Sequence, residues 1–497
     1  MDLLFKRLGE TFDESPPKSS TGSSTIQADI REPSKPIEAP AQDDAAPVFA
    51  IRDLASEMNA SIDSNTPIGQ EHRNEVHGLP EGMFTDEEVL QLITIFQQHY
   101  GRWIRWDETS IQANITRSSL LLCACCLIAV RHTSTEAANK VAPRLFDNTK
   151  KLIGITLLSS PQPIEFFQAS LILSMWSTTV GGKPYSVDSW LLTGFALQHA
   201  RSSNLFGHVL NQRPSTTYSK HEIDFWYIWN HLCLVHLHYC VGTRRKAMIG
   251  SCEVQRCKDV LKFDDDSNYE TRMVAETHLY WIMYEHCLNS NVDLPKTQSA
   301  LHSWKQEWDY VLQQPRSQFL QMGFHFAQLL AYERALKSRS ARVKEALLSE
   351  MVRLCAKIME LAIETTDERT RHLSDHIYHM ITFAAVTLSR LLSLYETQLK
   401  ATQDIDELDG LVWKLANWLG TIGLPCHAAH TLGEIVSAIQ TKLRPHTVPQ
   451  IEFPPDVADW SIEGMLNIPG LLDAHVSPGG HWDFAVDWEP FYQGPLT

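Results

Sequence analysis

The sequence lacks the patterns of secreted and membrane proteins. Its first residues, Met1–Arg7, contain no long apolar core of the kind that a signal peptide needs. No run of about 18 apolar residues occurs, and the apolar run Leu120–Val130 is too short to span a bilayer. We therefore expect a soluble intracellular protein with no membrane partner. Its ten cysteines are scattered among predicted buried helices, which fits the reduced thiols of cytosol or nucleus.

Sequence motifs of catalysis and nucleotide binding are also absent. The sequence has no Gly-x-Gly-x-x-Gly motif, phosphate loop, nucleophile elbow or His-Glu-x-x-His motif. The stretch Gly181-Gly182-Lys183 lacks the preceding strand that a phosphate loop needs, so we interpret residues 181–184 as an ordinary loop. The sequence therefore predicts no catalytic and no cofactor-binding residue, and we expect a protein that is not an enzyme.

Positive charge is scarce. Lysine and arginine number 43 against 59 aspartates and glutamates, which gives a net charge of −16. Such a surface repels polyphosphate, so nonspecific binding to nucleic acid is not expected. The run Arg244-Arg245-Lys246 is interpreted as the end of a helix, where cations complement the helix dipole, in preference to a nuclear-import signal.

Residues 1–80 contain little that could build a core. They are poor in aromatic residues and rich in Ser, Pro, Asp and Glu, and prolines such as Pro16, Pro33 and Pro47 interrupt any helix. We predict that residues 1–80 form a disordered N-terminal segment. Order is expected to begin near Phe84, because Thr85 followed by three acidic residues is typical of a helix N-terminus.

Helical periodicity continues from there to about residue 445, and no alternating stretch is long enough to predict a sheet. Helices are predicted over residues 119–131, 137–158, 163–176, 188–200, 220–241, 275–312, 317–340, 343–365, 372–400 and 407–443. Gly242 is expected to end the helix over 220–241, and Gly194 is expected to permit a close approach of two helices. The sequence thus predicts an all-α fold with one large multi-helix domain over residues 84–445.

The order of these segments resembles the regulatory, or middle homology, region of fungal zinc-cluster transcription factors. The helical segments Ile164–Trp176 and Asp188–Ala200 carry the resemblance, and Trp226, Gly242-Thr243-Arg244 and Trp304–Trp308 lie at comparable places. The family usually has Arg-Pro after this glycine, and the sequence departs from it there. The resemblance implies a regulator in the nucleus, or in nucleus and cytoplasm. It would act on a metabolic or secondary-metabolite pathway through effector or partner binding.

In that family a six-cysteine zinc cluster at the N-terminus binds DNA. Here the first cysteine is Cys123, and two Cys-x2-Cys halves within about 30 residues are absent. The zinc cluster, the cofactor of the family, is therefore not expected, and DNA binding is not supported by this chain alone. We expect a homodimer, or a heterodimer with an intact zinc-cluster factor.

The predicted helix over residues 220–241 is rich in possible metal ligands. They are His231, Cys233, His236, His238 and Cys240. Zinc needs about four ligands that converge tetrahedrally. On a helix Cys233, His236 and Cys240 share one face while the other two share another, so one helix offers three ligands at most. We predict core or groove-lining residues here, and no metal site.

Two alternatives to a regulator remain. The run Asp264-Asp265-Asp266 in a helical protein is compatible with a prenyl-diphosphate enzyme of the terpene cyclase type, in which paired carboxylates hold magnesium. No Asp-Asp-x-x-Asp pattern and no second metal motif accompany it, so a solvated acidic loop is the preferred interpretation. A non-catalytic helical scaffold is the other alternative.

Residues 451–497 form an acidic and aromatic tail. They contain eight acidic residues and no lysine or arginine. The aromatic residues that matter most are Trp460, Trp482, Phe484, Trp488 and Phe491. This composition predicts an activation segment that contacts the transcription machinery. The alternative, that the tail packs back on the helical domain, stays open.

An effector pocket is predicted inside the helical domain near Trp176, Trp190, Trp226 and His236. Effector sensing by this region is what the family resemblance implies. An apolar lining with tryptophan and histidine is equally what an ordinary helical core contains, and the general burial trend favours the core.

Overall fold

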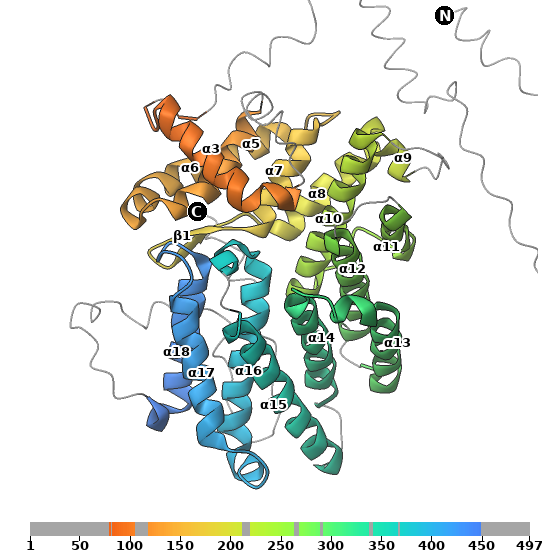
Figure 1. The fold of residues 1–497 in the computed structure, drawn as a ribbon, viewed down its shortest axis with the longest axis vertical. Coiled ribbons are helices and arrows are strands. Elements are labelled where there is room, and N and C mark those ends of the chain that lie inside the picture. Colours follow the sequence, from red (N-terminus) through yellow and green to blue (C-terminus); the bar gives the residue numbers. More distant parts are fainter. Residues whose placement is uncertain are drawn as a thin grey trace, which may run out of the picture. The chain divides into compact units, whose positions relative to one another are not determined.

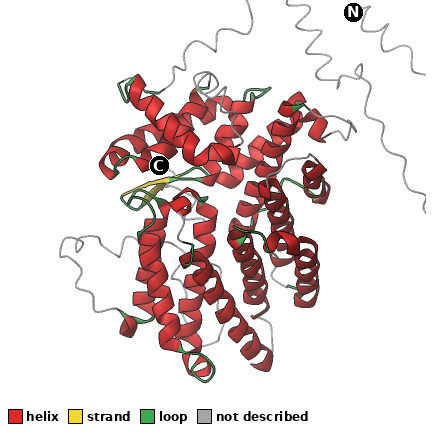
Figure 2. Ribbon diagram, viewed as in Figure 1, coloured by secondary structure: helices red, strands yellow, loops and turns green. Residues whose placement is uncertain are grey.

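The computed structural model of the chain describes residues 79–80, 82–104, 118–210, 219–262, 268–288, 292–336, 341–365 and 368–448. All of them belong to one compact unit that contains residues 67–497. The predictions for residues 1–78, for Asp264–Asp266 and for the tail 451–497 concern residues outside this description. Within the described residues the predicted all-α fold is confirmed, because helices make up nearly all of the regular structure (Figure 2).

The first described helices pack around one apolar helix. In chain order they are α3 (Asp86–Tyr100), the 3₁₀ turn η1 (Gly101–Ile104), α5 (Ser119–Ala129), the 3₁₀ turn η2 (Val130–His132), α6 (Thr135–Thr156) and α7 (Ile164–Met175). The almost fully buried α5 contacts α3, α6 and α7 (Figure 1). The predicted helix start at Thr85 is confirmed, because its hydroxyl accepts the Glu88 amide while the Glu88 carboxylate accepts the Thr85 amide.

A short β-hairpin follows α7. Its strands are β1 (Thr178–Val180) and β2 (Lys183–Tyr185), so the interpretation of residues 181–184 as a loop is wrong for 183 and 184. Gly181 and Gly182 have φ values of 57° and 75°, which fit a two-residue hairpin turn. Three residues per strand are too few for the alternation that predicts a strand. Thr178 also bridges to His427, so the hairpin connects α7 to the start of α18.

The middle of the unit is organised around one long helix. This part contains α8 (Ser189–Ser202), the 3₁₀ turn η3 (Asn204–Phe206), α9 (Gly207–Leu210), α10 (Lys220–Thr243), α11 (Ser251–Arg256), the 3₁₀ turn η4 (Cys257–Lys262) and α12 (Asn268–Cys287). α10 contacts α7, α8 and α12. It does not end on Gly242 as predicted, because Arg244 takes the left-handed conformation that ends the helix, with φ 56°. The run Arg244–Lys246 does follow a helix end, as expected.

The remaining helices are α13 (Leu294–Leu312), α14 (Gln318–Leu336), α15 (Ala341–Ile363), α16 (Asp375–Leu399), α17 (Ile405–Gly420) and α18 (Ala428–Leu443), with 3₁₀ turns η5 (Glu368–His372) and η6 (Pro445–Thr447). The predicted segments 275–312 and 407–443 each contain two helices. The first breaks before Asp293, which caps α13, and the second breaks at Gly423, whose φ is 70°. α15 packs between α14 and α16, and α18 packs on α16 and α17 (Figure 1).

α16 is the one described helix long and apolar enough to cross a membrane by length and composition. Of its most apolar stretch, 72% is buried inside the protein. Its neighbours α15, α17 and α18 cover it. This burial is what a central core helix requires, so the composition of α16 is explained by packing.

The last helices are fixed by a buried ion pair and a close helix contact. Arg444, just after α18, donates to both oxygens of Asp409 on α17 and to Glu396 on α16. Gly433 of α18 faces α17 so closely that an added Cβ would lie 3.0 Å from the Ala416 carbonyl oxygen. α17 and α18 therefore meet backbone to backbone at this point.

Candidate ligand-binding site

A cavity of about 150 Å³ lies between α7, the hairpin, α10, α16 and α18. Most of its wall is apolar, with Leu173, Trp176, Leu432 and Ile435 among the lining residues. A smaller polar part of the lining includes Ser174, Ser177, Tyr239 and Asp375. Residues from four distant segments, around 173–189, 239, 375–379 and 428–435, thus line one space, which no local sequence pattern predicts.

Trp176 is the one residue of the predicted effector set that lines this cavity. It is 2% exposed, and its indole nitrogen donates to the carbonyl oxygens of His372 at 3.2 Å and Leu373 at 3.1 Å. Its ring meets the Tyr100 ring edge to face, with centroids 4.8 Å apart. The tryptophan is thus a rigid wall, held from one side by η5 and from another by α3.

Trp190 and His236 lie together, outside the lining of that cavity. Their rings stack at 6.2 Å, and the Arg245 guanidinium lies 5.1 Å from the Trp190 ring while it pairs with Asp188. His236 Nε2 accepts the Met248 amide at 3.0 Å, so the proton resides on Nδ1, which lies 2.9 Å from Thr193 Oγ1. Burial lowers the pKa of His236 to about 4, and its neutral ring is fully bonded within the core.

Trp226 is 3% exposed within α10 and is likewise not part of the cavity lining. The four predicted residues therefore do not share one space in the described part of the chain. Trp190 and His236 fit the alternative of an ordinary core, while Trp176 lies on the cavity. An effector role for these four residues stays a prediction.

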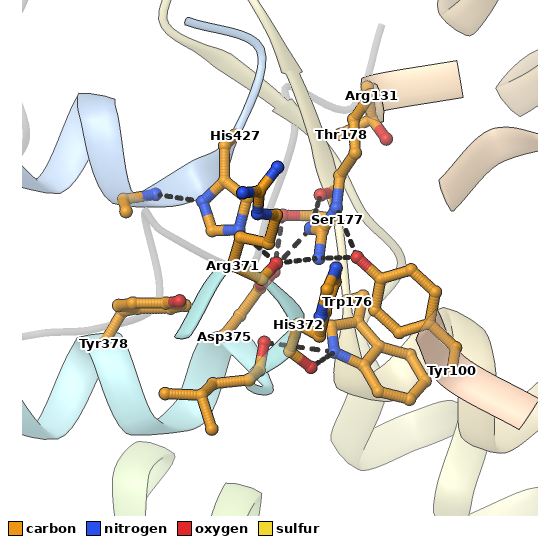
Figure 3. A network of polar contacts seen from close by, with 12 residues as sticks. Tyr100, Arg131, Trp176, Ser177, Thr178, Arg371, His372, Asp375, Tyr378 and His427 are labelled. Carbon is orange, nitrogen blue, oxygen red and sulfur yellow. Dashed lines mark hydrogen bonds and ion pairs between the residues drawn. The ribbon is translucent and has the colours of Figure 1, made fainter. Parts of the chain in front are cut away.

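A buried polar cluster, drawn in Figure 3, adjoins the cavity through Ser177 and Asp375, which line it. We call Tyr100, Arg131, Ser177 and Asp375 the Arg131 cluster. Arg131 donates to the Tyr100 hydroxyl through Nε at 3.1 Å and Nη2 at 2.7 Å. It also donates to the carbonyl oxygens of Ser177 at 2.9 Å and Arg371 at 3.4 Å. One guanidinium thus joins α3, η2, the hairpin and η5.

Asp375, in the first turn of α16, carries the balancing charge. Its Oδ2 accepts the Ser177 hydroxyl at 2.6 Å, and its Oδ1 lies 3.9 Å from Arg131 Nη1. Burial raises the pKa of Asp375 to about 6, although Arg131 and the Ser177 bonds act in the opposite direction. At neutral pH the carboxylate is therefore charged and is balanced by the Arg131 guanidinium.

Two polar atoms on this wall have no hydrogen-bond partner among the described residues. They are Asp375 Oδ1 and Ser174 Oγ, each on a residue that is at most 6% exposed. A helical serine commonly bonds the carbonyl four residues earlier, as Ser170 does with Phe166. Leaving such groups buried without a partner costs about 1–3 kcal/mol each. Both residues line the cavity, but these two atoms are themselves buried beneath its surface.

The possible metal ligands of α10 point to different partners. His231 Nε2 lies 2.8 Å from the Tyr269 hydroxyl, and His238 pairs with Glu276 at 3.0 Å. Burial raises the pKa of Cys233 and that of Cys240, the latter to about 12. No three or more His, Cys, Asp or Glu side chains converge as metal ligands anywhere in the described part of the chain. Each of these residues is accounted for by core packing.

The sequence was also compared with known proteins. The model of a protein family described as the middle domain of the transcriptional activator of proteases prtT matches residues 82–443. The chain belongs to this family. The predicted kinship with the regulatory region of fungal zinc-cluster factors is thereby confirmed. No solved structure gives a significant match to the chain.

Relatives of this prtT middle-domain chain are fungal regulators. An uncharacterized transcriptional regulatory protein of Schizosaccharomyces pombe is 26% identical over 355 residues, 69% of this chain and 66% of that protein. The prtT activators of Aspergillus clavatus and Penicillium rubens are 24% and 26% identical, over 87% and 62% of this chain. The matches span 69% and 48% of the length of those two proteins.

Membership of the prtT middle-domain family supports the regulator among the sequence hypotheses. The homologues are named as transcriptional activators or regulatory proteins, and the prenyl-diphosphate enzyme gains no support from them. Sequence reasoning did not single out Arg131 and Asp375 as site residues. Their signal was present, because Arg131 directly follows the apolar run Leu120–Val130 and Asp375 is the first residue of the largely apolar helix α16.

Proposed function

We propose that this protein regulates transcription in the nucleus and that residues 82–443 are its regulated domain. The observation that carries the proposal is the prtT middle-domain match over these residues. Relatives at 24–26% identity are named activators of proteases, so protease genes are the first targets to examine. The predicted role in a metabolic or secondary-metabolite pathway is the alternative set of targets.

The proposal assigns contact with DNA to a partner or to a segment beyond the helical domain. A homodimer, or a heterodimer with an intact zinc-cluster factor, would bring the domain to a promoter. The tail over residues 451–497, with its eight acidic residues, would then contact the transcription machinery. The cavity beside Trp176 is where an effector would act, because it joins the hairpin, α16 and α18.

A tethering experiment tests this function. The full chain is fused to an unrelated DNA-binding domain in a fungal host, and reporter transcription is measured. Fusion of the full chain should raise transcription several-fold, and deletion of residues 451–497 should abolish the rise. A deletion of equal length over residues 12–58 is the matched control. If neither the fusion nor disruption of the gene changes any transcript, the proposed function is wrong and the scaffold interpretation gains.

A further inference from the structure

Exposed apolar side chains gather along helix α8. In the described part of the chain nine large apolar side chains are exposed, and isolated ones of this kind are ordinary. Five of the nine lie on α8 or beside it. We call these five the α8 patch: Ile155, Leu158, Leu191, Phe195 and Met248. Apolar surface that is gathered in this way is typical of a site of protein–protein contact.

The outer face of α8 supplies the middle of the α8 patch. The helix packs on α7 and α10 with its other faces (Figure 1). Leu191 and Phe195 are four positions apart and therefore lie one turn apart on the exposed face. An added Cβ at Gly194 would lie 3.6 Å from Met248 Cγ, so the Met248 side chain rests against the same helix.

The end of α6 extends the patch beside the last turns of α8. His199 Nε2 lies 2.9 Å from the Leu157 carbonyl oxygen, which fixes this end of α6 against α8. Ile155 and Leu158 are exposed there, and Leu158 is 93% exposed. A leucine so exposed contributes little to the stability of a single chain, whereas its burial by a partner would be favourable.

Two ion pairs border the α8 patch, one at each end of α8. Asp188 pairs with Arg245 at 2.5 Å beside the first turn, and Arg201 pairs with Glu253 at 3.0 Å beside the last turn. All four side chains are partly exposed. Each end of the border therefore presents both signs of charge, which matches a partner that also presents both signs and not a uniformly charged one.

A second copy of the same surface meets these requirements. Phe195 lies at the middle of the 14-residue helix α8, so a twofold axis there would bring two Phe195 rings together. The two α8 helices would then run antiparallel, with Leu191 of each copy against the exposed Leu158 of the other. Asp188 of each copy would lie at the end where the other copy has Arg201, so that opposite charges meet.

We propose that the α8 patch is a homodimer interface, in which α8 packs antiparallel on α8 of a second copy about a twofold axis at Phe195. A contact centred on one helix belongs to the weak class of interfaces, which bury less than about 1,200 Å² in total. We expect a Kd of roughly 1–100 µM for this dimer. The use of the dimer at a promoter rests on the proposed function, whereas its formation does not.

Sedimentation velocity of the full chain over about 1–100 µM tests the proposal, and the mass should double across this range. Phe195→Asp would place two carboxylates at the axis and should weaken association at least tenfold. Leu158→Asp should weaken it at least threefold, and its position is so exposed that folding is preserved. Tyr310→Asp is the matched control, because Tyr310 is an aromatic residue of α13 with 56% exposure, and it should change nothing.

Two results would refute the interface. One is a chain that stays monomeric throughout, and the other is association that both aspartate variants retain. Deletion of residues 451–497 addresses a competing occupant of the patch. If the full chain is monomeric and the shortened chain dimerises through Phe195, the tail covers the patch and the proposal for the full chain is wrong.

A disulfide cross-link locates the axis. Phe195→Cys is made in a Cys252→Ala background, since Cys252 is the exposed cysteine of this chain. Mild oxidation should join two copies at position 195, and Tyr310→Cys in the same background should give at most a tenth of that product. A chain that dimerises without a link at position 195 would contradict the twofold arrangement.

Reporter fusions separate the interface from the proposed function. The full chain is fused to a DNA-binding domain that binds only as a dimer but cannot dimerise by itself, and in parallel to one that binds as a monomer. Phe195→Asp should abolish activation by the first fusion and leave the second active. Full activation by the first fusion in this variant would count against the interface. Inactivity of both wild-type fusions, with a dimer in sedimentation, would count against the proposed function alone.

Discussion

Arg131 and Asp375 form a buried ion pair in which Nη1 and Oδ1 are 3.9 Å apart, too far for a hydrogen bond. The guanidinium bonds instead to the Tyr100 hydroxyl and to two backbone carbonyl groups. The attraction between the charges therefore acts through space, in an interior where water does not screen it. The pair holds the N-terminal helices against α16.

Arg131→Met should destabilise the domain by about 3–5 kcal/mol, because it leaves Asp375 charged and unpaired in the core. Urea unfolding followed by circular dichroism measures the loss. Arg353→Met is the matched control, since Arg353 pairs with Glu350 on the surface with 54% of its side chain exposed, and it should cost less than about 1 kcal/mol. Equal losses in the two variants would contradict the role of burial.

Two glycines in α17 and α18 should respond to alanine in opposite directions. Gly410→Ala meets nothing within 4 Å and should stabilise the protein by about 0.5–1 kcal/mol through helix propensity. Gly433→Ala should destabilise it, because the new methyl group would press on the Ala416 carbonyl oxygen at 3.0 Å. Thermal unfolding of both variants gives the signs, and the same sign for both would refute this account.

Stability should fall steeply on acidification. Burial lowers the pKa of His231, His236 and His278 to about 4, against about 6.5 in an unfolded chain. Between these values the unfolded chain binds more protons, so the stabilisation is complete above pH 6.5. It is lost as the pH falls toward 4, by about 1.4 kcal/mol per pH unit for each histidine.

Asp375 opposes this trend, because its raised pKa makes the folded chain bind more protons between about pH 3.8 and 6. One carboxyl group does not offset three histidines. Urea unfolding at pH 7.5, 6.5, 5.5 and 4.5 measures the slope. His236→Gln should flatten it, whereas His302→Gln, at an exposed histidine, should not. A slope that is unchanged in His236→Gln would exclude this histidine as a source.

One thiol should react in the native protein. All ten cysteines lie among the described residues; Cys252 is exposed and the other nine are buried. Burial raises the pKa of Cys123 to about 11 and that of Cys287 to about 12, so their reactive thiolate forms are scarce. N-ethylmaleimide at pH 7.5 should label one site within minutes, none in Cys252→Ala and all ten after unfolding. Mass spectrometry counts the labels.

The helices could be predicted from the sequence because their signals are local. The cap of α3 is predicted by Thr85 and Glu88, which are three positions apart. The cap of α8 is predicted by Asp188, which directly precedes an apolar helix. Gly194 illustrates the limit of such signals. A Cβ there would lie 3.6 Å from Met248 and 3.7 Å from His236, an ordinary contact, so the expected close approach does not require glycine. What lies opposite a residue depends on tertiary packing.

The cavity could not be predicted, since its walls come from distant parts of the chain. Trp176 could be named as a large apolar residue, but its neighbours Leu432 and Ile435 carry no signal that connects them to it. Trp190 and His236 are residues of the same kinds, yet they stack on each other, and the His236 ring is fully bonded while Trp190 packs, partly buried, against the core. A cavity differs from a filled core only in a small unfilled volume between side chains, and residue types alone do not encode that volume.

The Arg131 cluster can form only late during synthesis of the protein. Ser177 and Asp375 are 198 positions apart, so at about 5–20 residues per second the ribosome needs roughly 10–40 seconds to supply the partner of Ser177. Through that interval the apolar side of α7 and the ring of Trp176 have no α16 or α18 to cover them. The nascent chain thus exposes apolar surface that chaperones can bind, and the cavity is among the last features to form.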